Sequence, residues 1–291
     1  TLPAIVAASR ARHKAKIVLA IQNALEPALF TNPGLYTRIQ RKLTEKLWPK
    51  ADGLIAISKG VAKDISTYLQ DKAPPMDVVY NVGKPLAEEL DRSGNASIDT
   101  PGDRIQLVAC GRLTRQKDYP TLLKAMSLLQ TSPRPILRIL GTGSDLNSLK
   151  ALVSELGLDG DVIFLGFRDD VLAHMRSADV FILSSRWEGF GNVIVEAMSV
   201  GTPVISTRCP HGPDEIITDG VSGRLVDVAD AGELAAAIDQ IVSNTDLSRR
   251  LAEAGLARAE DFSAAKIGAE YAASFRRFAE GKQPSRVMGA L

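Results

Sequence analysis

The stretch that decides the fold runs Ser184-Ser185-Arg186-Trp187-Glu188-Gly189-Phe190-Gly191-Asn192-Val193-Ile194-Val195-Glu196-Ala197-Met198-Ser199-Val200-Gly201-Thr202-Pro203-Val204-Ile205. It follows the apolar run 180–183 and is typical of a loop, a helix and a second β-branched strand. Its glycines let backbone N–H groups approach a ligand, and the helix start adds the positive end of a dipole. With Glu188 and Glu196 on either side, the stretch predicts a site for a diphosphate and a sugar.

Outward from this stretch, apolar runs alternate regularly with helical patterns. Strands are predicted at 105–110, 136–140, 162–165, 180–183, 203–206 and 224–226. Helices are predicted near 119–130, 144–157, 169–176, 192–200, 213–218, 230–242, 246–258 and 263–280. Continuous apolar strands that alternate with helices predict a parallel sheet covered on both faces.

The first part of the chain shows the same alternation less regularly. A helix end is predicted at 4–8, strands at 17–21, 51–57 and 78–80, and helices at 35–48 and 61–69. Residues 85–103 are polar and rich in turn-forming residues, which is typical of a linker. Because the chain begins at Thr1 with apolar structure following at once, we expect it to lack its natural start.

Composition narrows the class of protein. A chain of 291 residues favours two domains, and a net charge of +1 gives no argument for a nucleic-acid partner. No apolar run reaches the roughly 18–20 residues of a membrane span, and two cysteines are too few for a disulfide framework. These features favour a reducing, cytoplasmic setting. Residues 1–50 carry nine Lys or Arg against two Glu, so a membrane-surface role stands beside the alternative of a solvated helix face.

The segment 111–118 reads Gly-Arg-Leu-Thr-Arg-Gln-Lys-Asp and follows the strand 105–110. Ligands of open parallel sheets bind outside the carboxyl ends of the strands. There, Arg112 with its planar donors and Lys117 with its point charge would hold a diphosphate. The alternative is a solvated basic turn. Gly141-Thr142-Gly143-Ser144 follows the next strand, and by itself favours a tight turn with Ser144 as helix cap.

Glu188 and Glu196 admit a structural interpretation, because acids near a helix start interact favourably with its dipole. Two carboxylates beside a diphosphate would repel it unless they addressed hydroxyl groups while Arg112 and Lys117 neutralised the phosphates. A nucleotide sugar offers ribose and hexose hydroxyls on either side of its diphosphate. Glu196 suits one set of hydroxyls and Glu188 the other.

No metal site is predicted. Asp159-Gly160-Asp161 precedes the strand 162–165, at the edge of the sheet away from the ligand loops, and is interpreted as a turn. The three histidines are not predicted to be ligands, because His13 lies in a basic segment, His174 in an amphipathic helix and His211 in a loop.

Taken together, the motifs resemble the family 4 retaining glycosyltransferases of GT-B fold. The resemblance spans about residues 50–275 and rests on Gly111-Arg112-Leu113 with Lys117-Asp118, Gly141-Thr142-Gly143, Phe164-Leu165-Gly166-Phe167, Glu188-Gly189-Phe190-Gly191 with Glu196, and Gly201-Thr202-Pro203-Val204. One further motif resembles the Cys-Pro-x-Gly-Pro-x-Glu-Ile form that occurs in enzymes that build polysaccharides, lipopolysaccharides and lipid-linked oligosaccharides. In this chain it reads Cys209-Pro210-His211-Gly212-Pro213-Asp214-Glu215-Ile216-Ile217.

The resemblance implies an α/β protein of two Rossmann-like domains with parallel sheets, the first one incomplete. Residues 1–84 would be the final portion of the acceptor-side domain and 104–262 the donor-binding domain, with 263–291 forming a helix that crosses back, and a tail. The implied reaction moves a sugar from a nucleoside diphosphate sugar, UDP-linked in our expectation, to a glycan or lipid-linked acceptor. It proceeds with retention and needs no metal or other cofactor.

The resemblance also implies residue roles in the donor site. Arg112 and Lys117 would hold the diphosphate, Glu196 the ribose and Glu188 the donor sugar. The implied donor-binding set further includes Gly111, Gly141, Gly143, Phe167 at the base-binding edge, and the backbone of Phe190, Gly191, Asn192 and Val193.

Two departures from the family leave alternatives open. The glycine-rich turn that opens the family's first domain has no counterpart here, so a nucleotide-sugar-binding module that does not turn its ligand over is a second hypothesis. Many members place a sugar-contacting histidine after the strand corresponding to 17–21, where this chain has Gln22 and Asn23. Either amide would serve as a hydrogen-bonding substitute. A third hypothesis is an epimerase or phosphorylase of the same fold. Such enzymes need catalytic acids of their own or a cofactor-binding lysine, and the sequence contains no motif for either.

Overall fold

The structure is a computed structural model that describes residues 16–23, 35–85 and 104–281. The chain divides into two compact units, one of Thr1–Asn81 with Ala265–Leu291 and one of Val82–Ala264. The sequence placed these boundaries at 84/85 and 262/263. The predictions for 4–8, for 86–103 and for the tail beyond 281 lie outside the described residues.

The first unit contains a three-stranded parallel sheet in the order β1-β2-β3. Its strands are β1 (Val18–Ile21), β2 (Gly53–Ala56) and β3 (Met76–Val78), and its helical elements are α2 (Leu35–Leu47), η2 (Trp48–Lys50), α3 (Lys59–Leu69), η3 (Gln70–Lys72) and α12 (Ala264–Ala279). The prediction of a strand at 78–80 is wrong by two residues, because pairing with the short β2 already begins at Met76, opposite Leu54.

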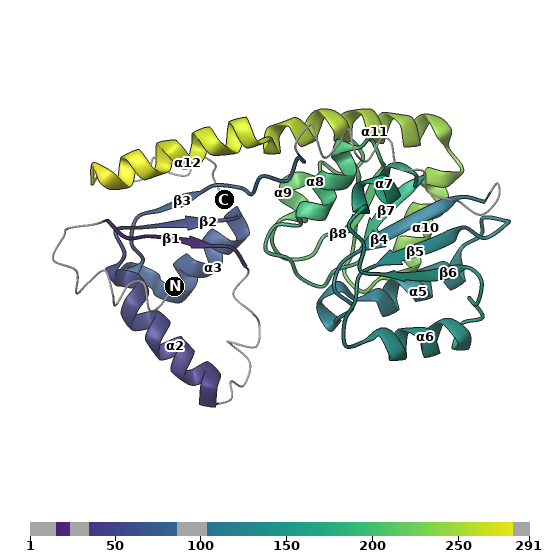
Figure 1. The fold of residues 1–291 in the computed structure, drawn as a ribbon, viewed down its shortest axis with the longest axis horizontal. Coiled ribbons are helices and arrows are strands. Elements are labelled where there is room, and N and C mark those ends of the chain that lie inside the picture. The colour runs from purple at the N-terminus through teal and green to yellow at the C-terminus, as the bar shows by residue number, and fades with distance from the viewer. Residues whose placement is uncertain (1–15, 24–34, 86–103, 282–291) are drawn as a thin grey trace. The chain divides into compact units, whose positions relative to one another are not determined.

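Helix α12 packs on this small sheet although it is far away in sequence. Ile267 and Phe278 of α12 form one core cluster with Ile55 and Val79. The close approach requires Gly53, since a Cβ at that position would lie 2.5 Å from the ring of Phe278. The last helix is therefore part of the first unit (Figure 1).

The second unit is built on a six-stranded, all-parallel sheet in the order β6-β5-β4-β7-β8-β9. Its strands are β4 (Gln106–Cys110), β5 (Ile136–Leu140), β6 (Val162–Gly166), β7 (Val180–Leu183), β8 (Val204–Thr207) and β9 (Arg224–Val226). Between them lie η4 (Arg115–Lys117), α5 (Tyr119–Leu128), α6 (Leu146–Glu155), α7 (Val171–Arg176), α8 (Asn192–Ser199) and α9 (Pro213–Ile216), followed by α10 (Ala231–Val242), α11 (Thr245–Ala259) and η5 (Glu260–Phe262).

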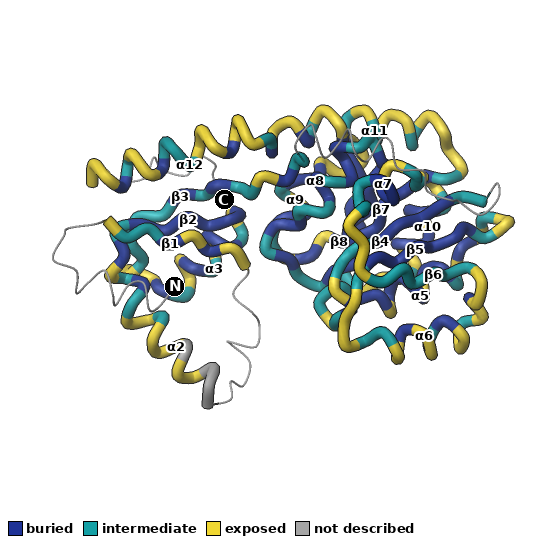
Figure 2. The backbone as a smooth tube through the Cα atoms, in the orientation of Figure 1, coloured by how far each residue is buried: buried dark blue, intermediate teal, exposed yellow. Residues whose placement is uncertain are grey.

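Helices cover both faces of the larger sheet, as the continuous apolar strands predict (Figures 1 and 2). On one face, Leu107, Leu137 and Ile182 join the core formed with α5, α6 and α10. On the other, α7 and α8 pack against β4, β7 and β8, and α11 packs on α8. The chain winds outward from β4 toward β6 and from β7 toward β9, so the strand order reverses between β4 and β7. A ligand crevice is expected at that reversal, outside the carboxyl ends of the strands.

The predicted helix cap at Ser144 is also wrong. Ser144 does not cap α6, because the helix begins at Leu146 with Asp145 in the cap position. The Ser144 hydroxyl instead donates to the Asp145 carboxylate at 2.7 Å.

Candidate functional site

The loops that follow β4 and β7 are joined by hydrogen bonds between residues about seventy positions apart. The Ser184 hydroxyl donates to the backbone oxygen of Lys117 at 2.7 Å, and the Gln116 amide donates to the backbone oxygen of Trp187 at 2.9 Å. The backbone N–H of Arg186 donates to the oxygen of Gln116 at 2.8 Å. These bonds fix the two sides of the predicted crevice against each other.

A buried ion pair lies between the same loops. The Nζ of Lys117 is 2.6 Å from Oε1 of Glu188, and the Ser185 hydroxyl donates to the same oxygen at 2.6 Å. Glu188 is 6% exposed. The backbone of Glu188 is held as well, by its N–H bond to the oxygen of Pro210 at 3.1 Å. The Lys117 ammonium and the Glu188 carboxylate therefore lie side by side. A negatively charged ligand group can bind the ammonium, and a hydroxyl group of the ligand can donate to the carboxylate.

A second ion pair supports the first. Asp118 is 3% exposed and has a left-handed backbone with φ of 46°. Its carboxylate accepts from the Thr121 hydroxyl at 2.8 Å and lies 3.2 Å from the Arg186 guanidinium. This pair fixes the residue that directly follows Lys117.

The glycines at the ends of β4 and β5 allow close backbone contact. A Cβ at Gly141, whose φ is 133°, would lie 2.0 Å from the oxygen of Gly111, and one at Gly143 would lie 2.2 Å from the oxygen of Leu113. The backbone of Leu113 also donates to Thr142 at 2.9 Å. The predicted glycines thus have a steric role, since they bring two strand-exit loops together.

Helix α8 points its amino end at this region. Gly191, with φ of 98°, immediately precedes Asn192 and Val193, the first two residues of the helix. The ring of Phe190 is buried and packs edge-on against Phe262 at a centroid distance of 5.4 Å. Phe190 therefore anchors the turn through its side chain, and only its backbone is directed to a ligand role in our prediction.

A cavity of about 230 Å³ opens where β4, β5 and β6 end. Its lining consists of Cys110, Gly111, Arg112, Leu140, Gly141, Thr142, Phe167, Arg168 and Val171. Phe167 is 76% exposed, an unusual state for a phenylalanine, and leaves a flat apolar face at the rim. Burial raises the pKa of the Cys110 thiol to about 11, so this wall carries no thiolate at neutral pH.

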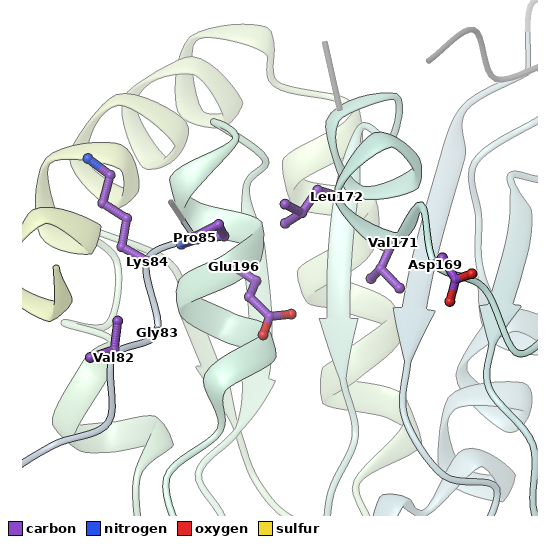
Figure 3. A pocket seen from close by; sticks show the side chains of 8 residues that line it. All are labelled: Val82, Gly83, Lys84, Pro85, Asp169, Val171, Leu172 and Glu196. Carbon is purple, nitrogen blue, oxygen red and sulfur yellow. The ribbon is translucent and has the colours of Figure 1, made fainter. Parts of the chain in front are cut away.

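A second cavity, of about 320 Å³, lies beside α7 and α8. It is lined by Val82, Gly83, Lys84, Pro85, Asp169, Val171, Leu172 and Glu196 (Figure 3). The figure shows the Glu196 carboxylate directed into the space, whereas Lys84 points away from it, toward its ion-pair partner Glu260. Val171 lines both cavities, so the segment 167–172 forms a shared wall.

The structure places every predicted site residue in the second unit, either in the loops at the carboxyl edge of its sheet or in helix α8. The sequence did not single out Ser185, Gln116, the Asp118–Arg186 pair or Asp169. Ser184 and Asp118 stood within quoted motifs, but their partners Lys117 and Arg186 lie about seventy residues away. No local pattern signals such contacts.

The other residues considered in the sequence, namely Asp161 and the Gln22-Asn23 pair, lie outside the loops at the carboxyl edge of the larger sheet. Asp161 accepts hydrogen bonds from Arg104 and Arg134 and precedes β6 in a tight turn. Within the described ranges, no three His, Cys, Asp or Glu side chains gather as metal ligands would. Gln22 and Asn23 are exposed, and the Gln22 amide lies 3.5 Å from the Tyr271 hydroxyl.

Comparison with known proteins gives one family and many relatives. The family described as Glycosyl transferases group 1 matches residues 94–258, more than half of the chain. The chain is 41% identical over 160 residues to the lipopolysaccharide core biosynthesis glycosyltransferase LpsE of Rhizobium meliloti, a match that covers 55% of this chain and 46% of the relative. It is 26% identical over 254 residues to N-acetylgalactosamine-N,N'-diacetylbacillosaminyl-diphospho-undecaprenol 4-alpha-N-acetylgalactosaminyltransferase of Campylobacter jejuni, covering 87% of this chain and 68% of that one.

Solved structures agree on the fold. The chain resembles Anabaena Alr3699/HepE, solved in complex with UDP, with a TM-score of 0.75 and 23% identity over 94% of this chain and 75% of that one. A sucrose-phosphate synthase from Thermosynechococcus elongatus gives a TM-score of 0.74 at 24% identity, covering 91% of this chain and 68% of the other. These similarities confirm the predicted α/β GT-B fold class with parallel sheets.

Proposed function

The chain belongs to the group 1 glycosyl transferases, and on that premise we propose that it moves a sugar from a UDP-sugar to a glycan or lipid-linked acceptor. The bond between the anomeric carbon and the diphosphate oxygen breaks, and the oxygen of an acceptor hydroxyl bonds to that carbon. The hydroxyl proton passes to the departing diphosphate, and the configuration is retained without a metal ion. The observation that carries this proposal is the meeting of Lys117, Glu188 and the start of α8 at the crevice between β4 and β7.

The departing diphosphate gains negative charge as the bond breaks, and fixed positive groups stabilise that charge. Arg112 and Lys117 supply two cations, and the amino end of α8 adds its dipole. Glu196 addresses the ribose hydroxyls from the second turn of α8. Glu188, held by Ser185 beside Lys117, addresses the donor sugar. The apolar cavity with the exposed Phe167 face receives the base.

Transfer assays with a panel of UDP-sugars test the proposal. Release of UDP from the wild-type chain is expected, and Lys117→Ala slows it by about a hundredfold, the typical cost of removing one group that stabilises developing charge. Glu188→Ala slows it as well, because it removes the proposed contact with the donor sugar and the partner that holds Lys117 in place. Arg115→Ala is the matched control, because Arg115 is an exposed base in the same loop. Wild-type rates in both site variants would contradict the assignment. NMR of the product anomer tests retention, and rates measured in EDTA test metal independence.

A second function is a nucleotide-sugar-binding module, because the chain matches only part of its relatives, 46% of LpsE among them. Calorimetry separates the two. UDP binding that is lost in Arg112→Ala and kept in Arg115→Ala, combined with no transfer to any acceptor, favours the module. Transfer by the same chain excludes it.

We further propose that α2 rests on an anionic membrane surface on the cytoplasmic side. Its residues Ile39 and Leu43 are 50% and 40% exposed, an apolar face beside Arg38, Lys42 and Lys46. Exposed apolar side chains flanked by bases are typical of interfacial helices. Among the described residues, no helix is both long and apolar enough to cross a bilayer.

Co-sedimentation with vesicles tests this surface. Binding is expected to rise with the anionic lipid content and to fall in Ile39→Ser/Leu43→Ser. The control is Leu128→Ser, since Leu128 is 49% exposed at the end of α5 in the other unit. If binding depends neither on the lipid charge nor on the α2 substitutions, the exposed face of α2 is a solvated surface and not a membrane contact.

A further inference from the structure

A charged side chain lies inside the larger sheet. Arg138 stands in the middle of β5 among Ile and Leu residues and is 2% exposed. Its Nη2 donates to the Ser177 hydroxyl at 3.1 Å, its Nη1 lies 3.5 Å from Nδ1 of His174, and its buried Nε has no partner among the described residues. Burying a guanidinium with so few partners is costly. An apolar residue would serve the sheet better, which points to another role.

The partners of Arg138 lead from the sheet to the wall of the cavities. His174 is 5% exposed, and its buried Nε2, which has no hydrogen-bond partner among the described residues, lies 3.6 Å from Oδ1 of Asp170. The Asp170 carboxylate in turn accepts two bonds from Arg168, from Nε at 2.9 Å and from Nη2 at 2.7 Å. Because a guanidinium can only donate, Nδ1 of the neutral imidazole accepts from Arg138 and Nε2 carries the hydrogen that faces Asp170.

The row formed by Arg138, His174, Asp170 and Arg168 is connected at both ends to residues that line the cavities. Cys110 and Leu140, which line the smaller cavity, are a register pair of β4 and β5. Arg138 lies two residues before Leu140 in β5 and therefore on the same face of the sheet, about 7 Å deeper. At the other end of the row, Arg168 lines the smaller cavity. The neighbours of Asp170, Asp169 and Val171, lie at the wall of the larger cavity, as Figure 3 shows.

We infer that Arg138 and His174 are positioning residues, which hold the start of α7 and the segment 167–171 in the shape that accepts the nucleotide part of the donor. The inference rests on the proposed UDP-sugar function. Arg138 fixes the imidazole, the imidazole orients the Asp170 carboxylate, and Asp170 holds the Arg168 side chain at the rim. Without the row, Arg168 and the backbone beside Phe167 lose their fixed position, although neither Arg138 nor His174 touches the ligand.

The row also makes the wall sensitive to pH. Burial lowers the pKa of His174 below the ordinary 6.5, and the positive charges of Arg138 and Arg168 lower it further against the opposing effect of Asp170. Asp179 is the remaining charge that acts on Arg138. When Nδ1 is protonated, the His174 ring becomes a positively charged imidazolium that faces the Arg138 guanidinium. Nδ1 can then no longer accept a hydrogen bond from Arg138. Donor affinity is therefore expected to fall as the pH drops through the folded-state pKa of His174, which lies below 6.5.

Three variants separate positioning from stability. His174→Leu removes the link and is expected to weaken UDP binding about tenfold, within the usual range for coupling through a network. His174→Gln keeps an acceptor and a donor but does not titrate, so it binds UDP like the wild type at pH 7.5 and loses less affinity at pH 5.5. Arg138→Met/His174→Leu replaces both partners by apolar groups, which restores thermal stability while binding stays about tenfold weaker.

Two readouts decide the outcome. The first is UDP binding by calorimetry. The second is hydrogen exchange of peptides that span 166–176, which is expected to accelerate in His174→Leu and in the double variant relative to peptides from α10, and which needs no ligand. Wild-type affinity in the double variant, or unchanged exchange in 166–176, would overturn the inference. Failure of the wild-type chain to bind UDP would instead overturn the proposed function, and the exchange result would still decide whether the row positions the segment.

Discussion

At the scale of single residues, the buried Lys117–Glu188 pair joins stability to the proposed chemistry. Both side chains are nearly enclosed, with 13% and 8% of their surfaces exposed. A buried charge that loses its partner costs far more than the intact pair contributes, because the remaining ion is left without solvent or counter-charge. A substitution at either position therefore affects the fold as well as the ligand.

We predict that Lys117→Met lowers the free energy of unfolding by about 3 kcal/mol, since it leaves the Glu188 carboxylate buried without its counter-charge. Lys117→Met/Glu188→Gln should recover much of this loss by removing the unpaired charge, yet remain without transfer activity. Urea denaturation and a transfer assay measure the two effects. Equal stability of the single and double variants would contradict the cost of the unpaired Glu188 charge. Transfer activity in the double variant would contradict the proposed role of the pair in the reaction.

Asp161 is a carboxylate that stabilises the fold and lies far from the donor crevice. Burial pushes its pKa upward, but the hydrogen bonds from Arg104 and Arg134 outweigh that effect, so the pKa lies below the ordinary 3.8. A depressed carboxyl pKa contributes stability above pH 3.8 and loses that contribution as the pH falls through the folded-state value. The turn depends on a charged Asp161.

Asp161→Asn is accordingly expected to cost about 2 kcal/mol at pH 7, the scale of hydrogen bonds to a charged group. The difference from the wild type should shrink as the pH falls below 3.8. UDP affinity should not change, because Asp161 lies at the amino end of β6. Urea denaturation at several pH values and calorimetry test both statements. A pH-independent difference, or weakened UDP binding, would show that Asp161 has another role.

At the scale of elements, the docking of α12 on the small sheet depends on one absent side chain. Gly53→Val would place its Cβ 2.5 Å from the Phe278 ring, and α12 must shift or separate from β2. We expect a loss of about 2 kcal/mol, typical of overpacking, with faster hydrogen exchange in 264–279. Gly268→Ala is the control within α12, because its Cβ meets nothing within 4 Å and helix propensity predicts a gain of about 1 kcal/mol. Unchanged exchange in Gly53→Val would contradict this account.

Other elements show why local pattern alone misjudges surfaces. Helix α2 has the periodicity of a half-buried helix, yet Ile39 and Leu43 are exposed. Periodicity reports that a helix has an apolar face, but not what covers it. In α6, likewise, Ser144 was expected to cap the helix and does not, because the turn that Gly143 makes against Leu113 sets where the helix begins.

At the scale of the whole molecule, the two units should respond differently to a nucleotide. All the predicted donor-binding residues lie in Val82–Ala264. UDP at about 100 times its dissociation constant stabilises its binding unit by about 2.7 kcal/mol. Hydrogen exchange should therefore slow in peptides from Val82–Ala264, foremost around 111–118 and 184–196, and stay unchanged in 35–81. Protection of β2 and α3 by UDP alone would contradict this division.

The sequence by itself determined the element order, the parallel sheets and the edge of the sheet at which the candidate site residues gather. Apolar runs and helical periodicity are local signals, and the geometry of a parallel sheet then brings the loops after its strands to one edge. For that reason Arg112, Lys117, Glu188 and Glu196 could be named from spacing alone.

Only the tertiary structure decided which of these residues touch. Lys117 and Glu188 meet across 71 positions, and Arg138 meets His174 across 36. The cavity beside Glu196 forms from residues 82–85 together with α7 and α8. Such contacts depend on how helices pack on the sheet to within a fraction of an ångström, which no periodicity encodes. The opening stretch thus fixed where the site lies, and packing decided that its first glutamate is paired with Lys117 while its second opens into a cavity.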